Sequence, residues 1–284
     1  MITVPACAKI NLTLEVLGKR ADGYHEIATV FQEIDLKDTL TFEEHPKLIL
    51  ECDDPDLQSD QNLAFKAARL LQEEAASRKG AFISIKKGIP VASGLGGGAS
   101  DAAATLRALN HLWGLGLPPE QLLKLASSLG SDIAFFLYGG TALGEGRGER
   151  VTPLPSYPVS WIVLFRPPVD IPSGKTKHLY DSLNASHFGE GRSTKEMVEM
   201  LNRGSEISLS CLVNTFEKVA FTVYDGLEAY WQRFRELGAD NIHLAGSGPT
   251  LFALAHDKRQ GEEIYRNLVK EGFEAYLIQS LATR

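Results

Sequence analysis

The chain has 284 residues, 44% of them hydrophobic and 23% charged, which are ordinary values for a globular protein of one large or two modest domains. Its net charge of -7 has the wrong sign for a surface that attracts a phosphate backbone, so we expect no nucleic-acid partner. This charge does not exclude a phosphorylated small molecule, because a few local cations and backbone amides can hold one inside a pocket.

Cysteine content and hydropathy narrow the class further. The three cysteines are widely spaced and form no Cys-x-x-Cys pair, so the pattern predicts reduced, buried thiols at Cys7, Cys52 and Cys211, not disulfides or a zinc site. No stretch approaches 18 apolar residues, and Lys9 stands where a signal peptide would need an apolar run. We therefore expect a cytoplasmic protein without a membrane span.

The chain opens with strand patterns. Polar and apolar side chains alternate over residues 9–16, which predicts a half-buried strand with a polar face made by Lys9, Asn11, Thr13 and Glu15. A turn-rich loop follows at 18–23. Further strands of a largely antiparallel sheet are expected at 24–34, 39–43 and 48–52.

Helical patterns come next. Apolar residues at helical spacing predict a helix at 62–74, and a strand at 82–86 ends before Pro90. An Ala-rich stretch predicts a helix at 100–113, and Gly130 closes another helix at 120–129. Five glycines in residues 139–150 predict a hairpin.

Prolines at 153, 155 and 158 form a linker, which divides the chain into an N-terminal domain of residues 1–156 and a C-terminal domain of residues 157–284. The second part is predicted to contain a strand at 161–165, helices at 195–201, 209–221 and 227–237, a hairpin around 246–249, a helix at 262–270 and a final strand at 273–278. Helices layered on a small antiparallel sheet would make a second α+β domain.

A glycine-rich loop lies between the strand at 82–86 and the helix at 100–113, and it reads Gly94-Leu95-Gly96-Gly97-Gly98. Glycines let the backbone approach an anion closely, and the first turn of a following helix adds unpaired amides and the positive end of its dipole. The loop therefore predicts a phosphate cradle, for which a triphosphate is the natural ligand.

Three other interpretations of this region are weaker. The pattern Gly94-x-Gly96-x-x-Ala99 formally matches the dinucleotide fingerprint but lacks a clear parallel βαβ setting. Gly174-Lys175-Thr176 resembles the end of a Walker motif, yet Val169 stands where that motif needs glycine. A plain turn capped by Ser100 or Asp101 would have no use for three consecutive glycines, which cost backbone entropy.

Three segments together resemble the GHMP kinase superfamily, named for galactokinase, homoserine kinase, mevalonate kinase and phosphomevalonate kinase. They are Pro5-Ala6-Cys7-Ala8-Lys9-Ile10-Asn11-Leu12, the glycine loop, and Ala245-Gly246-Ser247-Gly248-Pro249-Thr250. The resemblance implies an α+β fold of two domains, the GHMP kinase fold, with a ribosomal-protein-like N-terminal domain and a ferredoxin-like C-terminal domain.

Two further sequence motifs are similar to those of one branch of the superfamily. They are Arg20-x-Asp22-Gly23-Tyr24-His25 and Ser131-Asp132-Ile133-Ala134-Phe135-Phe136. That branch phosphorylates the 2-hydroxyl of a cytidine diphosphate conjugate of methylerythritol, on the non-mevalonate route to isoprenoid precursors. The resemblance implies ATP and Mg²⁺ as cofactors and this conjugate as a small-molecule substrate.

The resemblance also implies catalytic roles for two residues. Asp132 would accept or orient the hydroxyl proton, and Lys9 would keep that carboxylate ionised and neutralise developing charge. From the residues alone, Asp132 after Gly130 fits a helix N-cap equally well, and Lys9 fits a solvated strand lysine.

Binding roles implied by the resemblance fall into two groups. The nucleotide group comprises Asn62, Lys87, Pro90, Gly94, Leu95, Gly96, Gly97, Gly98 and Ser100, with Ser100 also a good helix N-cap. The substrate group comprises Asn11, Tyr24, His25, Thr176, Tyr180, Gly246 and Ser247. Tyr180 also fits a core aromatic, and the segment 246–248 by itself fits a simple hairpin turn. The resemblance implies instead that this segment lies against the glycine loop across the domain cleft and closes the active site.

Other functions stay open from the sequence alone. Another GHMP kinase acting on mevalonate or homoserine is the nearest alternative, and Tyr24-His25 favours the cytidine conjugate because a ring can stack on a base and imidazole can pair with it. A nucleotide-binding regulator without catalysis is a second alternative. The histidines show no His-Glu-x-x-His spacing, so no metal ion held by the protein alone is expected.

Overall fold

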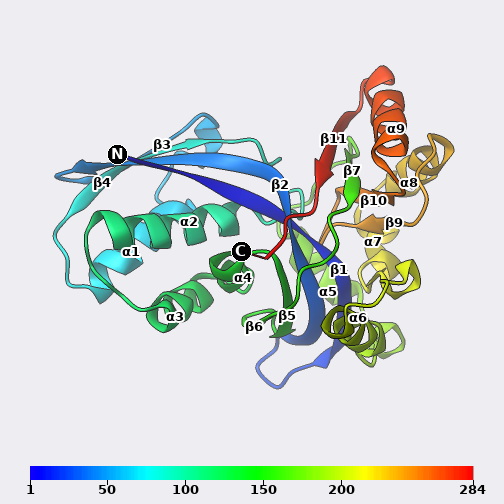
Figure 1. The fold of residues 1–284 in the computed structure, drawn as a ribbon, viewed down its shortest axis with the longest axis horizontal. Helices are drawn as coiled ribbons and strands as arrows, with labels where there is room; N and C mark the ends of the chain where they lie inside the picture. The colour runs from blue at the N-terminus through cyan, green and yellow to red at the C-terminus, as the bar shows by residue number, and fades with distance from the viewer. Residues whose placement is uncertain (284) are drawn as a thin grey trace. The chain divides into compact units, whose positions relative to one another are not determined.

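The computed structural model describes residues 1–283 (Figure 1), which form two compact units. Unit 1 comprises Met1–Ala8, Leu36–Val91 and Gly96–Gly139, and unit 2 comprises Lys9–Asp35, Ala92–Leu95 and the chain from Gly140 onwards. Two long strands, β1 (Ile2–Lys19) and β2 (His25–His45), contribute residues to both units.

Unit 1 places helices against a small sheet. β3 (Leu48–Cys52) pairs in parallel with β4 (Gly80–Lys86), and β4 pairs antiparallel with residues Thr39–His45 of β2. The helices of this unit, which Figure 1 shows on one side of these strands, are α1 (Leu63–Glu74), α2 (Gly97–Leu112), α3 (Pro119–Leu129) and α4 (Ile133–Tyr138), with a 3₁₀ turn η1 (Pro55–Leu57). Their alanines and leucines form the buried face, which also holds Trp113.

Unit 2 contains two sets of paired strands. β5 (Thr141–Gly146) pairs antiparallel with β2 and with β6 (Arg150–Pro153), while β8 (Val213–Asn214) pairs in parallel with β1. The second set is an antiparallel sheet of four strands in the order β11 (Glu274–Gln279), β7 (Trp161–Arg166), β10 (Leu251–Ala255) and β9 (Ile242–Leu244).

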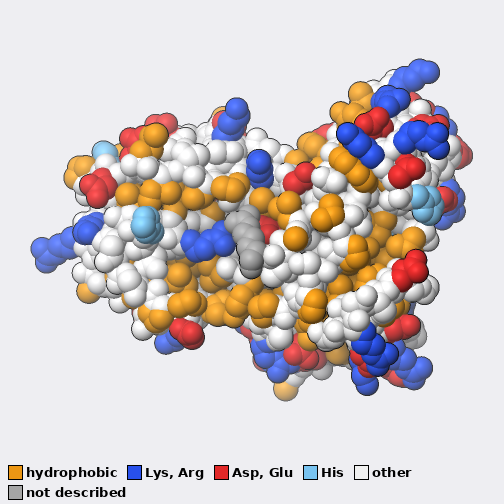
Figure 2. All heavy atoms as spheres, in the orientation of Figure 1, with side chains coloured by type: hydrophobic (Ala, Val, Ile, Leu, Met, Phe, Trp, Pro, Cys, Tyr) orange, Lys and Arg blue, Asp and Glu red, His pale blue; other side chains and the backbone are white. Residues whose placement is uncertain are grey.

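Helices of unit 2, apart from the one at Arg192–Arg203, bury apolar residues in a core shared with this second sheet, where Phe165 and Phe234 meet with ring centroids 5.4 Å apart. Their outer faces carry charges of both signs around α8 and α9, as Figure 2 shows, with ion pairs such as Arg266–Glu262. The helices are α5 (Lys175–Ser182), α6 (Arg192–Arg203), α7 (Glu217–Val223), α8 (Leu227–Glu236) and α9 (Lys258–Lys270), with 3₁₀ turns η2 (Ala185–His187) and η3 (Leu209–Cys211).

Most predicted elements are confirmed. The helix at 62–74 is α1, the helix closed by Gly130 is α3, the hairpin at 139–150 is β5 with β6, and the hairpin around 246–249 joins β9 to β10. The small antiparallel sheet under helices is also confirmed. The domain boundary at residue 156 stays a prediction.

Several boundaries were wrong. The strands predicted at 24–34 and 39–43 are one continuous strand, β2. The helix after the glycine loop begins at Gly97, three residues before the predicted start, and α5 was not predicted. The helix predicted at 209–221 is interrupted, because the Asn214 side chain accepts from the amide of Phe216 and donates to the carbonyl oxygens of Leu244 and Gly246.

The polar face of β1 also differs from its prediction, because it is not solvated. Lys9, Asn11, Thr13 and Glu15 are all buried. α6 covers this face: the amide of Thr194 donates to Glu15 Oε2 over 2.8 Å, and the hydroxyls of Thr194 and Thr13 lie 2.9 Å apart. The buried polar groups therefore have partners, as burial requires.

The three cysteines are free and buried, as predicted. Within residues 1–283, no helix is both long enough and apolar enough to cross a bilayer.

Candidate functional site

Lys9 lies at the centre of a buried polar chain in unit 2. Its Nζ donates to Asn11 Oδ1 over 2.7 Å, and Asn11 Nδ2 donates to Thr29 Oγ1 over 2.7 Å. Its Nζ also lies 5.4 Å from the centre of the Phe31 ring. A buried ammonium held in this way has a fixed position, so the solvated-lysine interpretation is wrong.

The glycine loop begins in unit 2 and packs backbone to backbone. The amide of Lys9 donates to the carbonyl oxygen of Leu95 over 2.9 Å. Gly94 has a φ of +89°, and a Cβ there would lie 2.1 Å from the Ala245 oxygen and 2.8 Å from the Gly248 nitrogen. Only glycine fits such a contact. The prediction that the turn at 246–248 lies against the glycine loop is therefore confirmed at Gly94.

Gly246 is constrained from the other side of the same contact. Its φ is +56°, and a Cβ there would lie 2.7 Å from the Gly94 oxygen and 3.0 Å from Lys9 Nζ. The turn is more than a simple hairpin connection, because it closes directly over the Lys9 ammonium. The sequence motifs around Lys9, Gly94 and Gly246 therefore meet at one place in unit 2.

Side chains from three further elements hold this turn. Asn214 donates to the Gly246 oxygen over 2.7 Å, the Tyr224 hydroxyl donates to the Ser247 oxygen, and the Lys175 ammonium donates to the Gly248 oxygen. The Thr176 and Ser247 hydroxyls lie 3.0 Å apart. Burial raises the pKa of Tyr224, so its hydroxyl stays protonated as a donor.

The predicted aromatic residues divide between two contacts. His25 stacks on Tyr180 with ring centroids 4.6 Å apart, and Tyr180 also packs edge-on against Phe216 at the core. Tyr24 is 54% exposed and lies under the guanidinium of Arg147. Burial and the nearby Lys19 lower the pKa of His25, which favours the neutral imidazole with one donor and one acceptor nitrogen.

The second part of the glycine loop belongs to unit 1 and starts α2. Gly96, with a φ of +77°, is the N-cap and supplies no side-chain hydrogen bond to the first turn. A Cβ on Gly98 would meet only Leu63 Cδ1, at 3.5 Å, so the fold itself does not require glycine there. The amides of this turn and the dipole of a 16-residue helix form a favourable anion site.

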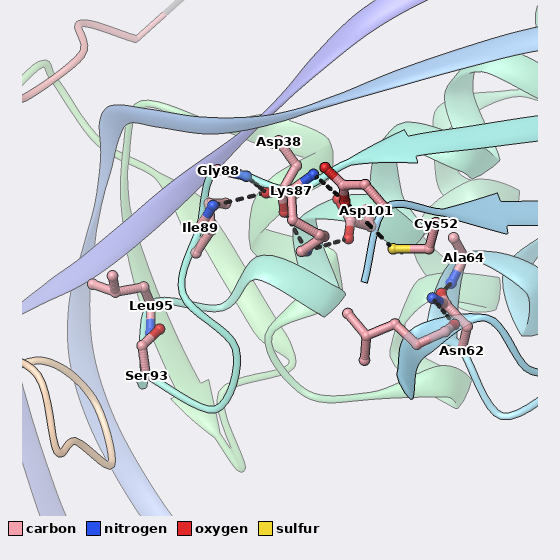
Figure 3. A network of polar contacts seen from close by, with 12 residues as sticks. Asp38, Cys52, Asn62, Ala64, Lys87, Gly88, Ile89, Ser93, Leu95 and Asp101 are labelled. Carbon is pink, nitrogen blue, oxygen red and sulfur yellow. Dashed lines mark hydrogen bonds and ion pairs between the residues drawn. The ribbon is translucent and has the colours of Figure 1, made fainter. Parts of the chain in front are cut away.

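Behind this turn lies a buried cluster of one lysine and two aspartates (Figure 3). Lys87 Nζ lies 2.5 Å from Asp38 Oδ2 and 2.8 Å from Asp101 Oδ2. Asp38 Oδ1 also accepts from the amides of Gly88 and Ile89, over 2.7 and 2.8 Å. The cluster fixes the segment that leads into the glycine loop.

Two carboxylates share a single ammonium in this cluster, so they cannot both be ionised at low cost. Burial raises the pKa of Asp101 to about 7, and the Asp38 carboxylate acts in the same direction against the opposing effect of Lys87. Among the described residues, Asp101 Oδ1 has no hydrogen-bond partner, which further disfavours its charged form. Asp101 is therefore the group that gains a proton as the pH falls below 7.

The remaining nucleotide candidates have structural partners of their own. Asn62 is the N-cap of α1, where its Oδ1 accepts from the Ala64 amide and its Nδ2 donates to the Leu57 oxygen. Ser100 lies buried inside the first turns of α2, so its predicted N-cap role is wrong and Gly96 has that position. Pro90 is half-buried at the start of the loop.

Asp132 occupies the N-cap position of α4 in unit 1, but its carboxylate makes no capping hydrogen bond. Asp132 therefore has the position of an N-cap residue, but its side chain does not cap the helix. The carboxylate is half-buried beside the apolar residues that follow it.

Sequence reasoning missed five residues that shape these sites: Asp38, Asp101, Lys175, Asn214 and Tyr224. Asp101 closely follows the glycine loop and Lys175 lies in the Gly174-Lys175-Thr176 motif, so their place in the sequence could have indicated a role at these sites. The other three act through contacts with residues 23 to 50 positions away, which no local pattern reveals.

Each unit offers donors of the kind that phosphates prefer. In unit 1 these are the amides at the start of α2, and in unit 2 they are the ammonium groups of Lys9 and Lys175. Among the described residues, no group of three or more His, Cys, Asp or Glu side chains could hold a metal ion.

Comparisons with known proteins agree with this chemistry. The family model described as GHMP kinases N terminal domain matches residues 62–140, and GHMP kinases C terminal matches residues 191–275. A 4-diphosphocytidyl-2-C-methyl-D-erythritol kinase of Dehalococcoides mccartyi is 45% identical over 281 residues, which cover 99% of both chains.

Solved structures give the same result for the fold. The crystal structure of a 4-(cytidine 5'-diphospho)-2C-methyl-D-erythritol kinase matches with a TM-score of 0.83 and 34% identity, over 98% of this chain and 99% of that one. A homoserine kinase of Cytophaga hutchinsonii matches with a TM-score of 0.76 at 19% identity, over 99% and 95% of the two chains, and this shares the fold alone. The predicted GHMP kinase fold is confirmed.

Asp101→Asn should change the pH dependence of stability. The pKa of Asp101 is higher in the folded than in the unfolded chain. Protonation of Asp101 therefore stabilises the fold at acid pH, and this stabilisation is lost as the pH rises towards 7. Asn cannot titrate. From pH 5 to pH 8, the free energy of unfolding of the variant should therefore rise relative to that of the wild type by about 1 kcal/mol or more, the energy of one pKa unit. Urea unfolding at both pH values measures this, with the exposed Asp60→Asn as control. If the difference in unfolding free energy between Asp101→Asn and the wild type does not change with pH, Asp101 does not have the raised pKa.

Gly94→Ala and Gly98→Ala should differ in stability. The Cβ added at residue 94 meets two backbone atoms at a positive φ, and we expect a loss of at least about 2 kcal/mol of unfolding free energy. The Cβ added at residue 98 makes only an ordinary van der Waals contact, with Leu63 Cδ1 at 3.5 Å, in a helix, where Ala is favoured over Gly by roughly 0.5–1 kcal/mol. Urea unfolding of the two variants tests this, and equal losses would contradict the backbone contact.

Proposed function

Because this chain belongs to the 4-diphosphocytidyl-2-C-methyl-D-erythritol kinases of the GHMP kinase family, we propose that it transfers the γ-phosphoryl group of ATP to the 2-hydroxyl of that substrate. The observation that carries the proposal is the match to a kinase of this name at 45% identity over 99% of both chains. In the reaction, the hydroxyl oxygen bonds to the γ-phosphorus, the bond to the β,γ-bridging oxygen breaks, and ADP leaves. The product enters the non-mevalonate route to isoprenoid precursors.

The amides of Gly96, Gly97 and Gly98 bind the ATP phosphates. The proposal is supported by the first turn of α2, which has no side-chain cap, and by Gly98, where a Cβ would have no tight contact and the missing side chain lets a ligand approach the backbone. Gly94 and Leu95 set the path of the loop through their contacts with Ala245, Gly248 and Lys9.

A Mg²⁺ ion bound with the nucleotide would neutralise charge on its phosphates. In kinases this ion is held largely by substrate phosphates and water, with one or two protein ligands. The Ser100 hydroxyl, next to the turn that binds phosphate, is the candidate protein ligand.

The remaining nucleotide residues act around the base. The Lys87 ammonium is bound by Asp38 and Asp101, and its amide donates to Asp53 Oδ1 over 2.9 Å, so Lys87 offers the adenine its aliphatic stem. Asn62, at the start of α1, contacts the adenine, and Pro90 sets the path of the chain into the glycine loop.

Lys9 and Asp132 carry the transfer step. Asp132 takes the proton of the acceptor hydroxyl, a role that suits a half-buried carboxylate at the start of α4. Lys9 neutralises charge on the transferring group, since Asn11 and the surrounding burial hold its ammonium in place.

The acceptor is bound by the remaining substrate residues. His25 is neutral and stacked on Tyr180, so its ring nitrogens can pair with the cytosine edge, while the exposed Tyr24 ring offers a stacking face. Asn11, Thr176, Gly246 and Ser247 surround the Lys9 ammonium and its turn, where they can orient the methylerythritol hydroxyls.

The choice of acceptor is tested by coupled ADP release. We expect turnover with 4-diphosphocytidyl-2-C-methyl-D-erythritol and background rates with mevalonate and homoserine, because the latter two lack a base for His25 and Tyr24. Turnover only with mevalonate or homoserine would refute the acceptor. ATP binding without turnover on any of the three would favour a nucleotide-binding regulator.

Asp132→Asn should lower kcat by about 10²–10⁴-fold, because the amide cannot accept the hydroxyl proton, while the affinity for ATP changes little. Steady-state kinetics and nucleotide titration separate the two quantities. Asp56→Asn, an exposed change in the same unit, is the matched control and should leave both unchanged. Wild-type kcat in Asp132→Asn would remove this residue from catalysis.

A further inference from the structure

Lys175 is a second lysine at the turn that covers Lys9. It is the first residue of α5, and its ammonium donates to the Gly248 oxygen. The Gly248 oxygen also lies 3.1 Å from the position of a Cβ on Gly94. The ammonium of Lys175 is therefore held beside the first glycine of the glycine loop, in the same unit as Lys9.

The surroundings of Lys175 do not suit a cation. In residues 1–283, its ammonium forms no ion pair with a carboxylate, and its hydrogen bond is to one carbonyl oxygen. The charged group that acts on it from another element is Lys9 on β1, with the same sign. On its own helix, Lys177 and Asp181 pair with each other over 2.6 Å at the exposed surface.

A purely structural role explains this arrangement poorly. A single hydrogen bond to a carbonyl oxygen contributes little to stability, and a neutral hydroxyl or amide could make it without a half-buried charge. A phosphate beside Lys175 would give its ammonium an anionic partner. Both ammonium groups lie at backbone segments that the proposed function assigns to phosphate and acceptor binding.

We propose that the Lys175 ammonium is a further phosphate-binding group of this kinase, which works with Lys9 on a phosphate of a bound ligand. This inference rests on the proposed function, because it needs phosphorylated ligands at this site. The phosphate can belong to ATP or to the diphosphate of the acceptor, and both present the same anionic oxygens.

The charge of Lys175 should then depend on the ligand. Burial and the nearby Lys9 lower the pKa of Lys175 to about 7 in the free protein. At pH 8 the group is mostly neutral, and a phosphate beside it favours the protonated form. Ligand binding should therefore take up roughly 0.5–1 proton at pH 8 and much less at pH 6.

Isothermal titration in buffers of different ionisation enthalpy measures this uptake. The probes are a non-hydrolysable ATP analogue with a β,γ-imido bridge, and cytidine diphosphate. Uptake with the first ligand assigns Lys175 to the nucleotide phosphates, and uptake with the second assigns it to the acceptor diphosphate. Each result supports the proposal.

Lys175→Met should abolish the uptake and weaken the same ligand roughly 10-fold or more, the usual effect of losing a charged hydrogen bond. Lys175→Arg keeps the cation but does not titrate, so it should recover much of the affinity without proton uptake. If Lys175 only anchored the turn, Lys175→Arg would not recover ligand affinity while proton uptake stays absent. Lys177→Met, on the exposed face of the same helix, is the matched control and should behave as the wild type.

Two results would overturn the proposal. If the wild type binds either probe and Lys175→Met shows the same affinity and the same proton uptake, Lys175 does not contact phosphate, and the proposed function stands. If the wild type binds neither probe, both the proposed function and this inference are wrong.

Discussion

The close contact between Gly94 and the turn from Ala245 to Gly248 is the constraint on which the rest of unit 2 depends. Two backbone segments more than 150 residues apart touch without side chains between them, since a Cβ on either Gly94 or Gly246 would overlap the other segment. This contact closes the turn over the Lys9 ammonium and brings the glycine loop beside β1. Asn214, Tyr224 and Lys175 hold the turn from three further elements.

The protein treats its buried charges in two opposite ways. In unit 1, Lys87 is shared by Asp38 and Asp101, so the cluster has an excess of carboxylate and one acid that readily accepts a proton. In unit 2, the Lys175 ammonium has one carbonyl oxygen as its hydrogen-bond partner, and Lys9 acts on it with the same sign of charge. The first arrangement pairs its lysine with carboxylates of the protein and fixes the backbone before the glycine loop. In the second, the proposed partner of Lys175 is a phosphate of a bound ligand.

Local chemistry made much of the fold predictable. Alanine-rich and amphipathic stretches with their caps gave α1, α3 and α8, and glycine and proline patterns gave the hairpins of unit 2. Predictions were wrong where a distant contact overrides the local pattern. Asn214 looked like part of a helix, but its side chain binds Leu244 and Gly246, and the helix starts only at Glu217. The start of α5 at Lys175 carries no side-chain cap that a sequence could show.

The sequence by itself predicted the chemistry. The residue types of the glycine loop indicate a phosphate, and the resemblance to the GHMP kinases predicts the roles of Lys9, Asp132, Tyr24 and His25. Only the tertiary structure decided which glycines are needed for packing and which leave room for a ligand, and which lysines are buried. It also decided that the polar face of β1 is covered by α6 and that His25 stacks on Tyr180. The physical reason is that burial and close approach depend on segments far apart in the chain, whereas glycine freedom and side-chain acidity are local.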